Sequence, residues 1–124
     1  MVNIWATFCG PCINEMPDLG ELAAEYADKG VGIVGIPVDI ADGAGTVDEV
    51  LFDEAVDIVT QTKAGYTHIV PTREMFDKRL GNVFSVPETI FVDSEGKQIG
   101  ESYLGARTKA QWKAIIDELL SEQK

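Results

Sequence analysis

Two cysteines, Cys9 and Cys12, are the residues of this sequence whose type and spacing most directly suggest chemistry. The run before them, MVNIWATF, is typical of a buried strand, and residues 10–29 show the periodicity of a helix. Gly10 permits a tight turn between the two, and Pro11 suits the first helical position because no backbone hydrogen bond is lost there. Unpaired amides and the helix dipole favour a thiolate at Cys9, while Cys12 lies one turn further in. The pair is therefore predicted to exchange with disulfides, with Cys9 as nucleophile and Cys12 as resolving thiol.

Other uses of the two thiols are less well supported by the sequence. A structural disulfide closing so small a loop would add little stability. A structural zinc site needs four ligands, and besides its two cysteines the chain has one histidine, His68, so no metal is expected. Copper handling through Cys9, Cys12 and His68 remains an alternative, as does a thiol peroxidase. A peroxidase would need a proline and a threonine arranged just before its reactive cysteine, which Thr7 and its neighbours do not supply.

The composition is that of an acidic globular protein. A chain of 124 residues with 45% apolar and 25% charged residues can bury one core, so we expect a single domain over residues 1–124. The net charge of −11 repels phosphate backbones and anionic lipid headgroups, so nucleic acid is not expected as a partner. No apolar run approaches the roughly 20 residues of a membrane span. Because the chain opens directly in a predicted core strand, we expect further sequence before residue 1.

Periodicity and turn signals predict the element order β-α-β-α-β-α-β-β-α. Pro17 lies inside the first helix, where a kink is expected. Capping boxes at Thr46 and Thr108 are predicted to open the second and the last helix. Strands that alternate with helices predict an α/β fold, with a mixed central sheet covered by helices on both faces and closed by an antiparallel hairpin. The predicted elements after the first helix are strand 31–38, a helix from Thr46 up to Gly65, strand 67–70, helix 72–80, strands 88–92 and 97–104, and a final helix from Thr108.

The cysteine motif and its surroundings resemble a known family. The run WATFCGPC is similar to the active site of the thioredoxin superfamily, and its continuation CINEMP resembles the TlpA/ResA-like branch of membrane-associated or exported thiol-disulfide oxidoreductases. Further along, VPETIFVDSEGK resembles that family's cis-proline loop and hairpin, and LGART its last loop. The helix and strand between Thr46 and Val70 resemble the central α-β insertion of this branch. The resemblance implies a thioredoxin-like fold over the whole chain, without the N-terminal elements.

The resemblance also implies where a substrate binds. Pro87 would be the cis-proline, with the Val86–Pro87 bond facing the cysteines and the Val86 backbone free to pair with an extended substrate. Glu88 is expected to place a charge at the rim of the substrate groove. Phe8 stands where a tryptophan is more usual, and Trp5 suits either this surface or the core. The candidate substrate-binding residues are Trp5, Phe8, Gly10, Pro11, Val86, Pro87 and Gly105.

Glu15 is the third candidate catalytic residue. It follows Cys12 by three residues, so it lies on the same helical face and could accept and return the proton of that thiol. A solvated surface glutamate is the alternative. Relative to thioredoxins, Asn3 replaces a buried aspartate and Gly35 replaces its companion lysine, so the usual proton relay is missing and Glu15 is the best remaining group. A carboxylate beside the thiols raises their pKa, while the helix terminus lowers it.

Taken together, these features predict a thiol-disulfide oxidoreductase that works as a reductase. No soluble cofactor is expected, because electrons would arrive by exchange from a partner dithiol. The resemblance implies a membrane dithiol carrier as the electron donor and disulfides of exported proteins as the substrates. It also implies a location outside the cytoplasm, with tethering or export through a segment before residue 1. We expect the domain to act as a monomer.

Overall fold

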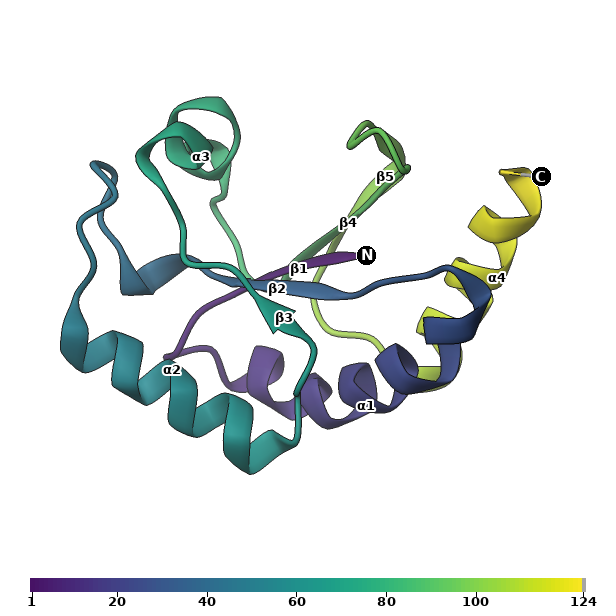
Figure 1. Cartoon of the computed structure of the whole chain (residues 1–124), viewed down its shortest axis with the longest axis horizontal. Helices are drawn as coiled ribbons and strands as arrows, with labels where there is room; N and C mark the ends of the chain where they lie inside the picture. Colours follow the sequence, from purple (N-terminus) through teal and green to yellow (C-terminus); the bar gives the residue numbers. More distant parts are fainter. Residues whose placement is uncertain (124) are drawn as a thin grey trace.

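The computed structural model describes residues 1–123 as a β-sheet flanked by helices (Figure 1). The predicted order of strands and helices is confirmed, and three short 3-10 turns are added to it. None of the helices within residues 1–123 is long and apolar enough to cross a lipid bilayer. The elements are β1 (Val2–Trp5), α1 (Gly10–Tyr26), η1 (Ala27–Lys29), β2 (Val34–Pro37), η2 (Val38–Ile40), α2 (Glu49–Thr62), β3 (Thr67–His68), α3 (Arg73–Lys78), η3 (Leu80–Asn82), β4 (Glu88–Val92), β5 (Gln98–Leu104) and α4 (Lys109–Glu122).

The sheet is mixed, with strand order β3-β2-β1-β4-β5. Strands β1, β2 and β3 run parallel, and β4 and β5 form the antiparallel hairpin. Helices α1, α2 and α4 cover one face, and the short α3 lies on the other (Figure 1). The predicted α/β class, with both faces of a mixed sheet covered, is confirmed.

Strand β1 lies at the centre of the sheet and sends alternate side chains to its two faces. Ile4 packs with Ile36 and Leu80 on the side of α3. Trp5 faces the other way and packs with both cysteines. On that same face α1 and α4 pack against each other through a cluster that includes Leu19, Leu22, Tyr26, Trp112, Ile116 and Leu119.

The strand register determines which loops meet. Trp5 pairs with Pro37 in parallel β2, and Ile4 pairs with Glu88 in antiparallel β4. The residues that follow Trp5, those that follow Pro37 and those that precede Glu88 therefore gather at one end of the sheet. This is the end where α1 begins and where the two cysteines lie.

The start of α2 differs from the prediction. The helix begins at Glu49 with Asp48 as its N-cap, so the capping box expected at Thr46 is wrong. Val47 forms an isolated antiparallel bridge with Ala41, which holds this stretch extended and delays the helix. The N-cap therefore lies two residues later than predicted, at Asp48 instead of Thr46.

Other boundaries agree more closely with the sequence pattern. The capping box of Thr108 with Gln111 is confirmed, with hydrogen bonds of 3.2 and 2.9 Å in the two directions. Helix α1 continues through Pro17. The strands predicted at 31–38 and 67–70 are shorter than expected: β2 pairs with β1 at four positions, and β3 pairs with β2 at only two.

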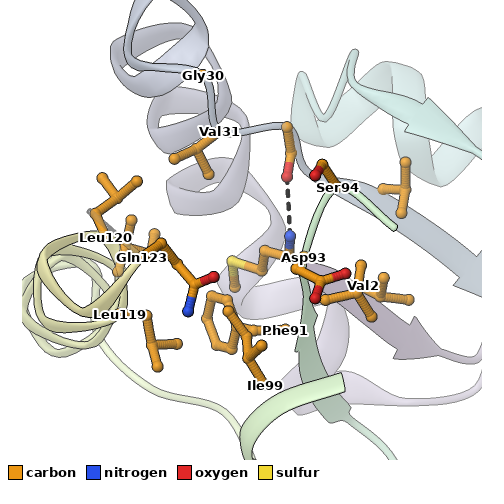
Figure 2. A pocket seen from close by; sticks show the side chains of 15 residues that line it. Val2, Gly30, Val31, Phe91, Asp93, Ser94, Ile99, Leu119, Leu120 and Gln123 are labelled. Carbon is orange, nitrogen blue, oxygen red and sulfur yellow. Dashed lines mark hydrogen bonds between the residues drawn. The ribbon is translucent and has the colours of Figure 1, made fainter. Parts of the chain in front are cut away.

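A cavity of about 540 Å³ lies at the opposite end of β1 from the cysteines (Figure 2). Apolar side chains such as Phe91 and Leu119 form part of its wall. The amino group of Met1 donates a hydrogen bond to the Gly32 carbonyl at 2.9 Å, and burial lowers the pKa of that amino group.

Candidate dithiol active site

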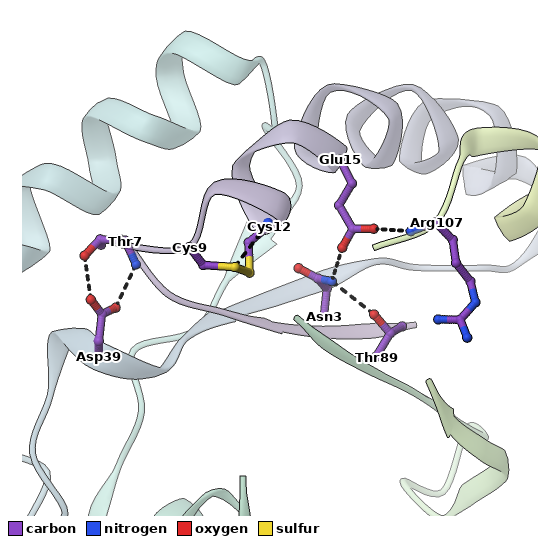
Figure 3. Close-up of a disulfide and its surroundings, with 8 residues drawn as sticks. All are labelled: Asn3, Thr7, Cys9, Cys12, Glu15, Asp39, Thr89 and Arg107. Atoms are coloured by element: carbon purple, nitrogen blue, oxygen red, sulfur yellow. Dashed lines mark hydrogen bonds between the residues drawn. A yellow bond between two sulfur atoms is a disulfide. The ribbon is translucent and has the colours of Figure 1, made fainter. Parts of the chain in front are cut away.

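The two cysteines form a disulfide at the start of α1, with their Cα atoms 5.3 Å apart (Figure 3). Cys9 is the N-cap of the helix, in extended backbone conformation, and its sulfur accepts a hydrogen bond from the Cys12 amide at 3.2 Å. Pro11 is the second residue of the helix, one position later than predicted and still within the first turn. Cys9 is 6% exposed and Cys12 is fully buried, so Cys9 carries the outer sulfur. The helix terminus and this amide both favour negative charge on Cys9 once the pair is reduced.

The loop that leads into Cys9 is held by an aspartate of the neighbouring strand connection. Asp39, in η2, accepts a hydrogen bond from the Thr7 amide at 3.0 Å and a second one from the Thr7 hydroxyl (Figure 3). The Cys9 amide in turn donates to the Ala6 carbonyl at 3.1 Å, which closes a tight turn. The sequence analysis missed Asp39. Its position shortly after a predicted parallel strand was the available signal, because the carboxyl ends of parallel strands meet.

The loop before β4 completes this end of the sheet. The Val86–Pro87 peptide bond is cis. Val86 packs against the cluster that contains both cysteines. The Gly105 amide donates to the Pro87 carbonyl at 2.9 Å, and Gly105 has a φ of +87°, a conformation that side-chain-bearing residues rarely adopt. The loop at Val86 thus lies beside the disulfide and is bonded to the turn at Gly105.

Exposure separates the candidate substrate-binding residues into two groups. Phe8, Gly10 and Pro11 are exposed, and Phe8 reaches 77%. Trp5 is fully buried, so its proposed place on the substrate surface is wrong and the core alternative holds. The sequence analysis also missed Phe84, whose side chain is 83% exposed in the loop before the cis peptide bond. A large aromatic residue in the polar run GNVFS was the available signal.

The Pro87 side chain is also buried, while Val86 and Gly105 are half-buried. At this loop Val86 is therefore more accessible than the Pro87 ring. The predicted substrate-binding residues that remain accessible are Phe8, Gly10 and Pro11 around Cys9, together with the loop at Val86.

Glu15 is buried, so the surface-glutamate alternative is wrong. One carboxylate oxygen accepts from the Asn3 amide group at 3.1 Å (Figure 3). The other accepts from the Arg107 backbone amide at 3.2 Å and from the Trp112 indole N–H at 3.1 Å. Burial raises the pKa of Glu15, and these hydrogen bonds together with the Arg107 charge oppose the rise. Trp112 is not among the site residues predicted from the sequence, although a buried indole N–H usually has an acceptor.

Asn3 occupies the predicted buried place on β1, behind the cysteines. Besides its bond to Glu15, its side-chain nitrogen donates to the Thr89 hydroxyl at 3.1 Å. Tyr66 lies close enough that the Glu15 charge, added to the effect of burial, raises the pKa of its phenol. Asn3 and Glu15 thus form a polar group of residues inside an otherwise apolar layer.

Gly35, which stands in the place of the lysine, has a steric reason to be glycine. It pairs with Asn3 on β1 and with His68 on β3. A Cβ atom at this position would collide with the His68 ring and touch the Trp5 indole nitrogen. The space that a longer side chain would need is filled by the imidazole of His68.

His68 has a structural role. Its Nδ1 accepts from the Trp5 indole N–H at 3.3 Å, so its Nε2 carries the proton and donates to the Ala64 carbonyl at 2.9 Å. The ring also stacks on Tyr66, with ring centres 4.5 Å apart, and burial lowers the His68 pKa. Both ring nitrogens are therefore engaged, which argues against copper binding by His68 and the cysteines. Within residues 1–123, no three His, Cys, Asp or Glu side chains are grouped so that they could hold a metal ion.

Glu88 does not place a charge at the rim of a groove, so that expectation is wrong. Its side chain is buried at the start of β4 and forms an ion pair with Arg79. The sequence analysis did not single out Arg79, because the two residues come from different predicted elements. The pairing neutralises the carboxylate inside the fold.

A disulfide-bonded cysteine pair at a helix start, beside a cis-proline loop on a mixed sheet, defines this chain as a protein of thioredoxin-like fold. Residues 1–119 match the Redoxin family, so the chain belongs to the redoxin family.

Curated relatives agree with this assignment. The thiol-disulfide oxidoreductase ResA of Oceanobacillus iheyensis is 33% identical over 99% of this chain and 58% of its own length. The thioredoxin-like protein YneN of Bacillus subtilis is 30% identical over 94% of this chain and 62% of its own length. The resemblance to ResA-like proteins is thus confirmed, and the chain spans about three-fifths of the length of these relatives.

Solved structures show the same fold. A thiol:disulfide interchange protein of the thioredoxin family from Chlorobium tepidum superposes with a TM-score of 0.77 at 24% identity, over 96% of this chain and 77% of the other. StoA from Bacillus subtilis superposes with a TM-score of 0.68 at 14% identity, over 91% and 78% of the two chains. At these identities the likeness concerns the fold, and the predicted thioredoxin-like fold is confirmed.

Replacing Asp39 should loosen the loop before Cys9. The Asp39→Ala variant removes both acceptors of Thr7, and we expect a loss of about 1–3 kcal/mol in the free energy of unfolding. Asp57→Ala, at an exposed position of α2, is the matched control and should change it by less than about 0.5 kcal/mol. Urea unfolding of the oxidised proteins measures both values. Equal effects of the two substitutions would contradict a fixing role for Asp39.

The raised pKa of Glu15 predicts a pH dependence of stability. Between the ordinary glutamate pKa and the raised one, the folded state keeps a proton that the unfolded state has lost, so stability should fall as the pH rises through this interval. The Glu15→Gln variant cannot release that proton and should lack this component. Unfolding free energies measured across the acidic to neutral range test this, with the exposed-site variant Glu54→Gln as control. Curves of the same shape for wild type and Glu15→Gln would show that Glu15 does not titrate as described.

Proposed function

We propose that this chain is a thiol-disulfide oxidoreductase that reduces disulfide bonds of proteins, with residues 1–124 forming one thioredoxin-like domain. The observation that carries the proposal is the arrangement of the two sulfurs: Cys9 lies outermost at the N-terminus of α1, and Cys12 is buried directly behind it. The names of the ResA relatives, thiol-disulfide oxidoreductases, support the same reaction class.

In the first step of the proposed reaction, the Cys9 thiolate attacks one sulfur of a substrate disulfide. A bond forms between Cys9 and that sulfur, the substrate disulfide breaks, and the second substrate sulfur leaves as a thiolate that takes up a proton. In the second step Cys12 loses its proton and attacks the Cys9 sulfur. The mixed disulfide breaks, the substrate leaves as a dithiol with two added electrons, and the Cys9–Cys12 disulfide is formed.

The surface around Cys9 is suited to an extended polypeptide. Phe8, Gly10 and Pro11 are exposed beside the outer sulfur, and Phe84 is exposed in the loop before Val86. A segment that pairs with the backbone at Val86 would run past Cys9 by strand addition, and the two phenylalanines would contact its apolar side chains. Sequence-independent backbone pairing of this kind would allow several protein substrates.

Regeneration of the dithiol requires a second exchange, which we assign to a membrane dithiol donor acting outside the cytoplasm. The same two steps in reverse would return two electrons to Cys9 and Cys12 without a soluble cofactor. The resemblance to the TlpA/ResA-like branch supports this location and a tether or export segment before residue 1. We further propose that the domain is a monomer, because copies with a net charge of −11 repel one another.

The different burial of the two sulfurs predicts different reactivity. In the reduced protein at neutral pH, iodoacetamide should label Cys9 well before Cys12, as followed by mass spectrometry of the digested protein. Cys12→Ser should accumulate a mixed disulfide with a small disulfide-containing peptide, because the resolving thiol is gone. Cys9→Ser is the matched control and should form none. Equal labelling of the two cysteines, or trapping by Cys9→Ser, would contradict the assigned roles.

We assign to Glu15 the tuning of the dithiol and the transfer of the Cys12 proton. Its charge lies one helical turn from Cys12 and raises the pKa of nearby thiols. Glu15→Gln removes that charge, so the rise of the exchange rate with pH should move to lower pH. Stopped-flow exchange with a small disulfide measures the profile, with Glu54→Gln as control. A profile that matches wild type would leave Glu15 with a purely structural role.

A further inference from the structure

Exposed apolar side chains gather on the segment 47–70, which contains α2 and the edge strand β3. Exposed apolar surface is unfavourable in water, and a cluster of it marks a candidate interaction surface. The segment supplies six of the nine large apolar side chains that are exposed within residues 1–123: Val47, Val50, Phe52, Val56, Ile69 and Val70.

Four of these six side chains line one groove between α2 and the residues that follow β3. Phe52 and Val56 form one wall and Ile69 and Val70 the other, while Trp5 contributes to its floor. The volume is about 220 Å³. Sites for free small molecules usually have about 300–1,000 Å³, so this groove is better matched to one or two large side chains of a protein segment.

The rim of the groove is acidic. At about 100° per residue, Phe52 and Val56 share a face of α2; Glu49 and Asp53 lie beside that face, and Asp57 lies further round toward solvent. All three are exposed. No lysine or arginine is among the described residues that line the groove. An apolar floor beside a row of carboxylates selects for an apolar segment that carries positive charge.

We propose that this groove binds a basic segment of another protein. One or two large apolar side chains of the segment would fill the groove between Val56 and Ile69, and its lysines or arginines would contact Glu49, Asp53 and Asp57. A second copy of this chain fits less well, because two acidic helices would meet in molecules of charge −11. An anionic membrane surface is disfavoured for the same reason.

The groove does not include the residues assigned to the proposed redox function. Cys9, Cys12 and Glu15 do not line the groove. Loss of binding at the groove and loss of disulfide exchange can therefore be observed separately in the same variants.

Titration of the isotope-labelled full chain with synthetic peptides tests the proposal. A leucine-and-lysine peptide should shift the amide signals of residues 52–60 and 67–70. A leucine-and-glutamate peptide and a lysine-and-glycine peptide should each bind at least about tenfold more weakly, because each lacks one half of the recognition. Added salt should weaken the binding of the leucine-and-lysine peptide, since its charges would pair with exposed carboxylates.

Two variants of the same charge locate the binding. Val56 lines the groove, so Val56→Asp should lower the affinity for the leucine-and-lysine peptide by about tenfold or more, as expected for loss of a central apolar contact. Val50 is 75% exposed and does not line the groove, so Val50→Asp should not weaken the binding of this peptide. Both variants should keep wild-type disulfide exchange.

Several results would overturn the proposal. Shifts that map outside the groove, or equal binding of the lysine and glutamate peptides, would do so. Concentration-dependent self-association through the same amides would make the surface a homodimer contact instead. Preferential binding of anionic lipid vesicles at these residues would assign it to a membrane.

Discussion

A buried carboxylate needs hydrogen-bond donors, and the donors of Glu15 come from different parts of the chain. Asn3 reaches it from β1, Trp112 from α4, and the backbone amide of Arg107 from the loop between β5 and α4. Glu15 itself lies one turn after Cys12 on α1. These hydrogen bonds connect α1 to β1, to α4 and to the loop before α4. The position of the dithiol relative to the sheet therefore depends on them.

The Glu15 carboxylate and the N-terminus of α1 have opposite effects on the cysteine thiols. Burial opposes the charge on Glu15 and raises its pKa, and a carboxylate there also disfavours a thiolate nearby. The N-terminus of α1 acts in the opposite direction, because its amides stabilise negative charge at Cys9. Asp39 adds a second anchored carboxylate on the other side, where it holds Thr7. The reactivity of the pair follows from the balance of these nearby effects.

The molecule presents two apolar surfaces of different character. Around Cys9 the exposed aromatic residues are Phe8 and Phe84, which lie on loops at the end of the sheet. The groove beside α2 is instead bordered by carboxylates and lies on a regular helix and the sheet edge. A transient substrate and a more selective partner could thus be recognised by separate regions, one by backbone pairing and one by charge.

The sequence by itself determined the chemistry and the order of elements, because both depend on local information. The spacing of Cys9 and Cys12, the turn residues between them and the helical and strand periodicities are all readable over short windows. Family resemblance then indicated the place of Pro87. Only the tertiary structure decided that Glu15 is buried, that Glu88 is neutralised by Arg79, and that Trp5 belongs to the core. Each of these outcomes depends on a partner contributed by another element, and the strand register that brings the partners together arises only when the whole sheet has formed.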